Sequence, residues 1–266
     1  MIELSVVVSV YENDNPQEFL KAIDSIFDQS YAPAEVIICA DGPLSDDLED
    51  VVSELGTRSI VTILRLERNI GLGGSRHYAI MNSNGKYVAV MDADDVSTHD
   101  RFKLQIEAHR AAQIDVVGGY IKEFSENGKT RIRDVPLRHD DIFKRGKYRS
   151  PVNHVTVMFK RDSYMSSGGY DAIRGVEDYD LFHRMLVGGY KFKNISEILV
   201  EVKFDNEVMV RRRGYTYLKC WLKLLFSMYQ SGYLNLFQLI GLSCVHSAVK
   251  LSPAFVTPLI YKLIRS

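Results

Sequence analysis

The sequence predicts an α/β fold in which helices flank a mostly parallel central sheet. Three observations carry this prediction: strand patterns alternate with helical patterns, the first strand pattern is mainly apolar and β-branched, and polar residues follow the strand patterns where they end. Strands buried on both faces read as continuous apolar runs, and strand-helix alternation is typical of parallel sheets. Ligands of such sheets bind beyond the carboxyl ends of the strands.

The first half of the chain contains four strand patterns with three helical patterns between them. Leu4–Val10 is a β-branched apolar run, and Pro33 separates the first helical pattern from the second strand. The predicted strands cover residues 4–10, 35–40, 59–66 and a run beginning at Lys86, and the predicted helices cover residues 19–27, 46–55 and 77–83.

The second half, to about residue 202, has a more mixed pattern. The sequence Glu126-Asn127-Gly128-Lys129 is typical of a hairpin turn between two strands. A helix is predicted to begin near Glu177, and residues 139–148 are charged without strong periodicity. The other predictions are a helix over 101–112 and strands over 114–124, 130–135, 155–160 and 195–202.

Composition narrows the class of protein. The chain has 266 residues and 46% apolar content, enough to fill a sizeable core. A formal charge of −1 gives no overall attraction to nucleic acid, so we expect no nucleic-acid partner. The three widely separated cysteines favour a reducing, cytoplasmic compartment over a disulfide framework or a zinc site. Met1 is not followed by a signal-peptide pattern, so we expect no secretory signal.

The run that begins at Lys86 ends on three carboxylates, Asp92, Asp94 and Asp95. Carboxylates this close repel one another unless a cation or strong donors compensate them, which favours a hard divalent ion bound by oxygen. Mg²⁺ and Mn²⁺ use few protein carboxylates and complete their shell with water and phosphates, so the sequence predicts a diphosphate ligand. An acidic turn that caps the next helix is the alternative, because Ser97, Thr98 and Asp100 are also capping residues.

Polar side chains are expected to converge at the carboxyl edge of the sheet. They are Tyr11, Asp41, Asn69, Arg76, Asp92 and Asp94, each at a strand end or in the turn after it. The glycines after Asn69 could indicate a dinucleotide fingerprint, but they follow the third strand instead of the first, and no acid sits where a ribose partner should be.

The predicted helix near Glu177 carries three acids in its first turn, Glu177, Asp178 and Asp180. Acids there are favoured by the helix dipole, worth about 0.3–1 kcal/mol each, so capping is one interpretation. A single acid would be enough for capping, so the presence of three favours a catalytic role for some of them. His154 lies where the chain leaves a loop, and a lone histidine can be structural or functional.

The part of the chain from Arg211 onward combines basic residues with bulky apolar ones, and no Asp, Glu, Lys or Arg lies between Lys223 and Lys250. Polar residues and glycines interrupt it, so it is not a clean membrane span. A pair of amphipathic helices at an anionic membrane surface is one prediction. Helices that complete the core or form a homodimer contact are the alternatives. We divide the chain into a catalytic domain, residues 1–204, and this C-terminal helical segment, residues 205–266.

With these motifs in view, the chain resembles the inverting family 2 glycosyltransferases of the nucleotide-diphospho-sugar transferase (GT-A) fold over residues 4 to about 202. The resemblance is carried, in order, by Ser-Val-Val-Val-Ser-Val-Tyr at 5–11, Asp41, Arg-Asn-Ile-Gly-Leu-Gly-Gly-Ser-Arg at 68–76, Asp-Ala-Asp-Asp at 92–95, and Glu-Asp-Tyr-Asp-Leu at 177–181. The chain departs at Asp41-Gly42-Pro43, where relatives often have a second Asp and a Ser, and at His77, where Asn is common.

The resemblance implies a role for each matching residue. Tyr11 would stack on uracil, Asp41 would accept a hydrogen bond from its imide, Asp94 would ligate Mn²⁺ or Mg²⁺, and Asp178 would be the catalytic base with Glu177 beside it. Arg76 would border the base, and Asp92 would lie near the ribose and sugar. We add Val10, Glu12, Asn69, Gly71 and Ala93 to the donor site, and Asn153, His154 and Arg211 to the acceptor or phosphate side.

The segment after residue 204 resembles the C-terminal segments of bacterial enzymes that assemble exopolysaccharide, capsule or O-antigen units on a lipid carrier. This resemblance is less specific than that of residues 4 to about 202. The implied activity is transfer of a hexose from a UDP-sugar to a saccharide on an undecaprenyl-diphosphate type lipid, at the inner face of the bacterial membrane. A nucleotidyltransferase of the same fold would need a glycine-rich phosphate loop after the first strand, which residues 11–16 lack. A non-catalytic carbohydrate-binding or scaffold protein is the other alternative.

Overall fold

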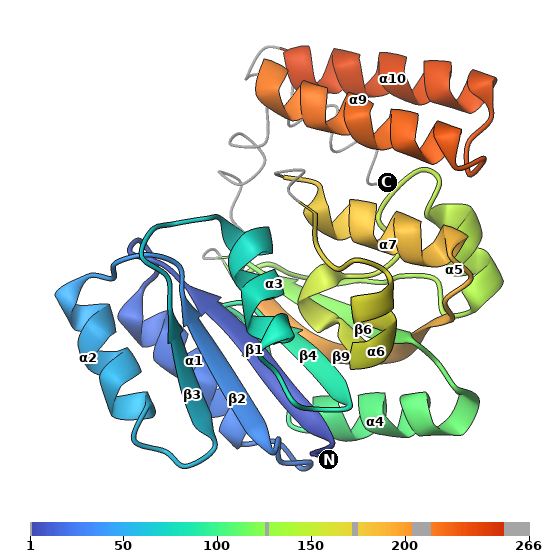
Figure 1. The fold of residues 1–266 in the computed structure, drawn as a ribbon. Coiled ribbons are helices and arrows are strands. Elements are labelled where there is room, and N and C mark those ends of the chain that lie inside the picture. The colour runs from blue at the N-terminus through green and yellow to red at the C-terminus, as the bar shows by residue number, and fades with distance from the viewer. Residues whose placement is uncertain (1, 126–127, 172–174, 204–213, 253–266) are drawn as a thin grey trace.

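The computed structural model describes residues 2–125, 128–171, 175–203 and 214–252 (Figure 1). The first half comprises β1 (Leu4–Val10), α1 (Pro16–Phe27), β2 (Glu35–Ala40), α2 (Asp46–Leu55), β3 (Val61–Arg65), α3 (Leu72–Met81) and β4 (Tyr87–Met91). The second half comprises β5 (Val96–Ser97), α4 (Arg101–Ala112), β6 (Val116–Phe124), β7 (Thr130–Arg133), α5 (His139–Arg145), the 3₁₀ turn η1 (His154–Thr156), β8 (Met158–Lys160), α6 (Arg161–Ser166), α7 (Glu177–Val187), β9 (Phe192–Lys203), α9 (Tyr215–Gln230) and α10 (Leu236–Leu251).

Within these residues one sheet holds nine strands in the order β3-β2-β1-β4-β8-β6-β9-β5, with β7 paired to β6. The pairings among β3, β2, β1 and β4 are all parallel, as the sequence predicts. The other half is mixed, because the short strand β8 runs antiparallel to both β4 and β6. The carboxyl ends of β1, β2, β3 and β4 therefore meet at one edge of the sheet, where the predicted site residues follow them.

Helices cover both faces of the sheet (Figure 1). Because strand side chains alternate in direction, Val6 and Val8 of β1 join one core with α1, α2 and α4, whereas Val7 joins the other. That second core includes α3 and α7 and extends to Leu224 of α9. The sheet is thus a buried layer between two apolar cores, which accounts for the apolar strand sequences.

Helix α1 begins at Pro16, three residues before the sequence pattern placed it. The side chain of Asn15 accepts hydrogen bonds from the backbone N–H groups of Gln17 and Glu18, and proline is well tolerated at the first helical position. Because this cap fixes the start of α1, the loop between β1 and α1 is short.

The prediction of a helix over residues 77–83 is wrong at its beginning, because α3 begins at Leu72. Gly73 and Gly74 lie in its first turn despite their low helix propensity. A Cβ on Gly73 would lie 3.0 Å from Cγ of Glu177, so the glycine allows α3 to approach the start of α7 closely. Tertiary packing therefore overrides the local preference, and Arg76 lies within a helix instead of in a turn.

The predicted strand over residues 155–160 is also wrong in part, because η1 occupies its beginning and β8 keeps three residues. The Thr156 hydroxyl donates to the Asn153 carbonyl oxygen at 2.7 Å and accepts from the Gly119 N–H at 3.0 Å. These bonds stabilise the 3₁₀ turn. Residues 139–145, which show no strong periodicity, form the short helix α5.

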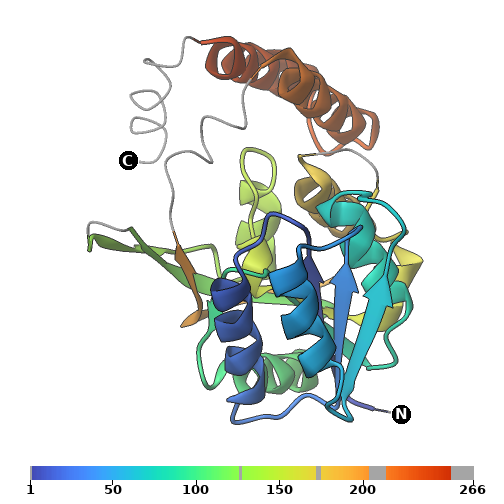
Figure 2. The same ribbon diagram turned by 90° about the vertical axis from the view of Figure 1, so that its left-hand side faces the viewer.

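Helices α9 and α10, which we call the C-terminal hairpin, lie side by side beyond α7 (Figure 1 and Figure 2). Leu224, Leu225 and Met228 of α9 are buried in the core that contains α7. The inner face of the hairpin thus completes the core, one of the alternatives open from the sequence. None of the helices in the described part of the chain is both long and apolar enough to cross a membrane.

Candidate active site

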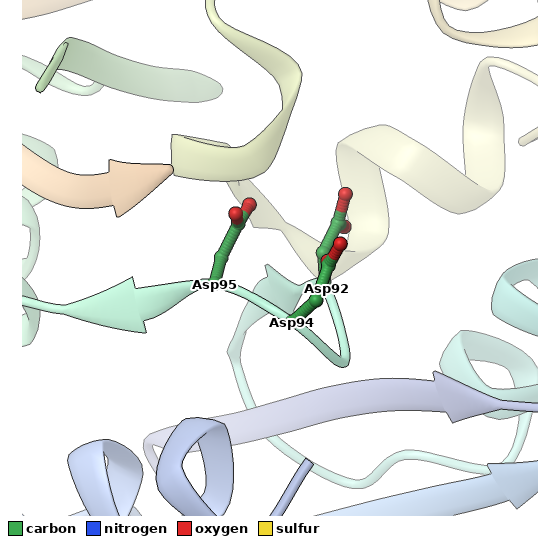
Figure 3. A group of neighbouring side chains, drawn as sticks. All are labelled: Asp92, Asp94 and Asp95. Atoms are coloured by element: carbon green, nitrogen blue, oxygen red, sulfur yellow. The ribbon is translucent and has the colours of Figure 1, made fainter. Parts of the chain in front are cut away.

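Three carboxylates follow β4, as the sequence indicates. The side chains of Asp92, Asp94 and Asp95 offer oxygens that all lie within 4.8 Å of one another, and they point to the same side of the turn (Figure 3). Asp94 is exposed, Asp92 is half-buried and Asp95 is buried. The turn between β4 and β5 is short, which accounts for this crowding.

The crowding is unfavourable for the ionised carboxylates. Desolvation by the surrounding protein and then the charge of Asp92 raise the pKa of Asp94. Burial, followed by the charges of Asp92 and Asp94, raises the pKa of Asp95 to about 9. A bound divalent cation would relieve this repulsion, and oxygen donors are those that Mn²⁺ and Mg²⁺ prefer. The donor set therefore fits the predicted metal, with Asp94 as the exposed ligand.

A buried arginine that the sequence analysis missed lies near the three carboxylates. Arg101 of α4 is fully buried, and its guanidinium donates to the Val90 carbonyl oxygen at 2.8 Å and to the Ser97 hydroxyl at 2.9 Å. Arg101 thereby joins the end of β4 to β5 and fixes the turn between them. Its charge favours the ionised form of Asp95. The sequence places Arg101 at the start of a helix, where an exposed arginine is the usual interpretation.

Arg76 of α3 forms an ion pair with Asp92. Its Nη1 lies 3.5 Å from Nδ1 of His154, and His154 Nε2 lies 2.6 Å from the Tyr170 hydroxyl. Burial opposes the charge of Arg76, but Asp92, Tyr170, Asp178 and Glu177 together raise its pKa. Desolvation, and then Arg76 itself, lowers the pKa of His154 well below its ordinary value, so His154 is neutral at pH 7. The predicted residues of β4, α3 and η1 therefore meet in one polar network.

Asp41 binds the backbone of the chain segment that precedes α3. Its carboxylate accepts the N–H of Ile70 at 2.7 Å and the N–H of Gly71 at 3.0 Å. Asn69 Oδ1 also accepts the Gly71 N–H, at 3.1 Å. Gly71 has a positive φ of 87°, a conformation that glycine adopts without strain. Asp41 thus positions the glycine-rich segment, a role that the sequence analysis did not anticipate.

The loop after β1 carries the predicted stacking residue. Tyr11 is 37% exposed, which leaves its ring open to a planar ligand, and Glu12 beside it is exposed as well. The Tyr11 N–H donates to Asp14 at 2.9 Å. Burial, and then the charges of Asp94 and Asp92, raises the pKa of Asp14 to about 6, so Asp14 lies near the acid cluster. Asp14 is not among the site residues that the sequence analysis selects.

Val10 and Ala93 are buried, so they shape the site through their backbone positions. Asn153 is buried too, and its amide donates to the Gly119 and Arg133 carbonyl oxygens at 2.9 and 3.1 Å. These bonds brace η1 against β6. Contact of Asn153 with an acceptor stays a prediction. Arg211 lies outside the described residues.

The three acids at the start of α7 have different environments. Asp180 is buried and forms an ion pair with Arg184 at 2.8 Å, so it is structural. Asp178 is half-buried, and its Oδ1 accepts the Tyr179 N–H at 2.8 Å. In the part of the chain that the structure describes, Glu177 Oε2 is buried without a hydrogen-bond partner. Glu177 and Asp178 face the Arg76 network, since both influence the pKa of Arg76.

Comparison with known proteins shows which family the chain belongs to. The family model "Glycosyl transferase family 2" matches residues 5–166. The chain is 31% identical over 218 residues to the amylovoran biosynthesis glycosyltransferase AmsE of Erwinia amylovora, covering 81% of each chain. It is 30% identical over 263 residues to the UDP-Gal:alpha-D-GlcNAc-diphosphoundecaprenol beta-1,3-galactosyltransferase of Escherichia coli, covering 98% of this chain and 95% of the relative.

Among solved structures, that of S. aureus TarS 1-349 in complex with UDP-GlcNAc superposes with a TM-score of 0.70 at 15% identity. The match covers 94% of this chain and 74% of that one. This likeness confirms the predicted GT-A fold. The length of the family match and the identity to full-length relatives are sufficient to assign the family, and the chain is a member of glycosyl transferase family 2.

Proposed function

We propose that this glycosyltransferase moves a hexose, with inversion, from a UDP-sugar to a saccharide on a lipid diphosphate in the synthesis of a bacterial surface polysaccharide. The observation that carries the proposal is the position of Arg76, which pairs with Asp92 after β4 and lies close enough to Asp178 and Glu177 at the start of α7 for their charges to raise its pKa. The activity for which the Escherichia coli relative is named and the UDP-GlcNAc ligand of the TarS structure support the donor and acceptor classes.

The donor side comprises residues that follow β1, β2, β3 and β4. Tyr11 would stack on uracil, Asp41 and Gly71 would border the base, and Asp92 would lie near the ribose and sugar. Asp94 would hold Mn²⁺ or Mg²⁺, and the ion would offset the negative charge that develops on the departing diphosphate. Arg76 holds Asp92 in place, so this carboxylate is already oriented before the donor binds.

The chemical step needs a base on the acceptor side. As the bond between the anomeric carbon and UDP breaks, its electron pair leaves with UDP, and the acceptor oxygen forms the new bond from the opposite face. Asp178 takes the proton of that hydroxyl. General-base help of this kind contributes about 10²–10⁴ in rate. One displacement inverts the anomeric centre, so an α-linked donor yields a β-linked product.

Glu177 would act beside the base. Its buried, unpaired Oε2 is an acceptor with no partner among the described residues, and such a group is costly unless a ligand satisfies it. We assign it to a hydroxyl of the substrate. His154, held between Arg76 and Tyr170, would present its neutral ring to the acceptor or phosphate side.

The test uses Asp94→Asn and Asp178→Asn with a panel of UDP-sugars and a synthetic polyprenyl-diphosphate N-acetylglucosamine acceptor. Asp178→Asn should lose at least about 100-fold in turnover while keeping Mn²⁺-dependent UDP binding by isothermal titration. Asp94→Asn should lose that binding. Near-normal turnover in either variant would remove that residue from its role. Absence of metal-dependent UDP binding in the unmodified chain would favour a non-catalytic scaffold.

We further propose that the outer face of the C-terminal hairpin docks on the anionic inner surface of the bacterial membrane. A shallow hollow on α9 is lined by Tyr215, Leu222 and Phe226 together with Lys219 and Lys223. On α10, Phe237 is 86% exposed, and Ile240 and Leu251 are more than half exposed. Basic residues beside exposed apolar ones are typical of interfacial helices.

The charge distribution supports a membrane over a second copy of the chain. Lys219 and Lys223 lie on the outer face of α9, and none of the 34 Asp and Glu residues follows position 207. Two such basic faces would repel each other, whereas an anionic lipid surface attracts them. The hairpin also lies on the side of the molecule toward which β2 and β3 point (Figure 2). A membrane there would face the edge of the sheet that carries the site.

Sedimentation with anionic liposomes tests this docking. The double variant Lys219→Glu, Lys223→Glu should partition about 30-fold less, because each basic residue near the surface contributes about 1 kcal/mol. Lys103→Glu, at an exposed position of α4, is the control and should partition like the unmodified chain. Equal partition of all three, or a concentration-dependent dimer that stays off the vesicles, would contradict membrane docking.

A further inference from the structure

The inner face of α9 contacts the chain immediately before the candidate catalytic acids. A Cβ on Gly175 would lie 2.6 Å from Cε1 of Tyr217, so the tyrosine ring packs directly on the glycine backbone. Gly175 has a φ of +89°, which a residue with a side chain rarely adopts. Gly175 lies two residues before Glu177 and three before Asp178. Tyr217 thus lies against the turn that leads into α7.

One helical turn further along α9, Trp221 contacts α7 itself. Its ring packs edge-to-face on Tyr179, with 5.7 Å between centroids. The Tyr179 hydroxyl donates to the Gly146 carbonyl oxygen at 2.8 Å, which fixes the ring from the other side. Such aromatic pairs contribute about 0.5–1.5 kcal/mol beyond their buried area. The two aromatic residues of α9 therefore contact Gly175 and Tyr179, which flank Glu177 and Asp178 in sequence.

Helix α10 supports these rings from behind. His246 stacks on Trp221 with 3.9 Å between centroids, and Lys250 Nζ lies 5.9 Å from the centroids of both Trp221 and Tyr217. Burial, followed by the charge of Lys250, lowers the pKa of His246 to about 4, so its stacked ring is neutral. The Gly214 N–H donates to the Lys250 carbonyl oxygen at 3.1 Å. Helix α10 thus supports the side of α9 that packs against the start of α7.

The start of α7 depends on this packing because it lacks a side-chain cap. Its N-cap residue is Val176, which makes no capping hydrogen bond. Ser, Thr, Asp or Asn at that position would contribute about 0.5–2 kcal/mol and would fix the first turn locally. Here the position of the first turn, and hence of Asp178, relies on contacts from other elements.

We propose that Tyr217 and Trp221 are positioning residues for the proposed base, Asp178. The C-terminal hairpin is then part of the catalytic apparatus, in addition to any docking by its outer face. This inference rests on the proposed function, since it assumes that Asp178 takes the acceptor proton. A base displaced by about 1 Å can lose about 10²-fold in rate without loss of substrate binding.

The experiment compares Tyr217→Ala with Tyr217→Phe, using the best donor and acceptor pair from the substrate panel. Tyr217→Ala should lower kcat by about 10- to 100-fold while KM for the UDP-sugar and Mn²⁺-dependent UDP binding stay within about twofold. Tyr217→Phe keeps the ring atoms that contact Gly175 and should restore kcat. Tyr229→Ala removes a tyrosine with an exposed ring from the same helix and should leave both constants unchanged.

Trp221 is the only tryptophan in the chain, so intrinsic fluorescence reports whether the C-terminal hairpin stays packed in each variant. An unshifted emission together with a reduced kcat supports positioning. Normal kcat in Tyr217→Ala overturns the inference, and so does a red-shifted emission with kcat and UDP binding lost in parallel, since Tyr217 would then serve only the fold. Failure of the proposed base looks different, because Asp178→Asn would remain active whatever Tyr217→Ala does.

Discussion

Arg76 and Asp92 form an ion pair that joins helix α3 to the end of strand β4. The side chain of Arg76 is 6% exposed and that of Asp92 is 24% exposed. The two residues come from different elements, yet both belong to the set of strand-end polar residues that the sequence analysis selected. Their pairing means that the site is partly assembled before any ligand binds.

Replacing one partner of this pair should lower the free energy of unfolding, whereas replacing both should restore most of it. Arg76→Met leaves Asp92 uncompensated beside two further carboxylates, and we expect a loss of stability on the order of 3 kcal/mol in urea unfolding. Asp92→Asn in the same chain should recover most of that loss, giving a coupling energy above about 1 kcal/mol in a double-mutant cycle. Additive effects of the two substitutions would show that the pair is not energetically coupled.

The structure predicts opposite effects of Asp94→Asn with and without metal. In EDTA at pH 7 the variant should be more stable than the unmodified chain, because a carboxylate with a raised pKa is penalised when ionised in the folded state. With Mn²⁺ at about 100 times its dissociation constant, binding should add about 2.7 kcal/mol to the unmodified chain, or about 5–10 °C in Tm. The variant should gain much less.

Differential scanning fluorimetry with EDTA or Mn²⁺ measures both effects. Asp50→Asn, at an exposed position of α2, is the control and should respond to Mn²⁺ like the unmodified chain. An equal response of Asp94→Asn would mean that the ion binds elsewhere.

Asp41→Asn should weaken the fold as well as nucleotide binding. The asparagine amide keeps one acceptor oxygen but presents its own N–H donors to one of the two backbone N–H groups. We therefore expect the free energy of unfolding to fall by about 1.5–3 kcal/mol. Binding of inorganic pyrophosphate with Mn²⁺ should weaken too, because the segment at Gly71 shifts. If Asp41 served only the base, stability and pyrophosphate binding would be unchanged and UDP binding alone would fall.

Buried histidine makes the fold acid-sensitive. Burial lowers the pKa of His109 from 6.5 to about 4, and its Nδ1–H donates to the Ile114 carbonyl oxygen at 2.8 Å. The unfolded chain binds a proton near pH 6.5 and the folded chain does not, so stability is retained above pH 6.5 and falls progressively as the pH drops toward 4. The loss from this group is on the order of 3 kcal/mol.

Urea unfolding across pH 4–8 checks this expectation. His109→Gln removes the titrating ring and should flatten the pH dependence, whereas His99→Gln, at an exposed histidine, should preserve it. Identical pH profiles for His109→Gln and the unmodified chain would contradict the assignment.

Elements with strong local patterns were predictable from the sequence. The bounds of β1, β2, α2 and α4 agree with the predicted ranges, because their apolar spacing and their flanking polar residues give the same answer. The start of α3 was not predictable, since Gly73 and Gly74 have poor helix propensity and are held helical by contacts with Glu177 and Ile70. Strand β8 was overestimated because Thr156 bonds to a residue distant in sequence.

The candidate site shows the same division. The acids after β4 and at the start of α7 are recognisable from their positions after predicted elements. The roles of Arg101 and Asp14 were not, because each depends on a partner far along the chain or on burial that no local pattern reveals. The sequence groups Asp180 with the other two acids of the first turn, whereas the structure pairs it with Arg184.

Gly73 has one more implication. Because a methyl group at this position would press on the Glu177 side chain, the absence of a side chain at Gly73 sets how near α3 and the start of α7 can come. Gly73→Ala would thus act as a spacer that pushes the Glu177 side chain away from α3. Enlarging a single hydrogen atom to a methyl here is the smallest change that would separate these two helices.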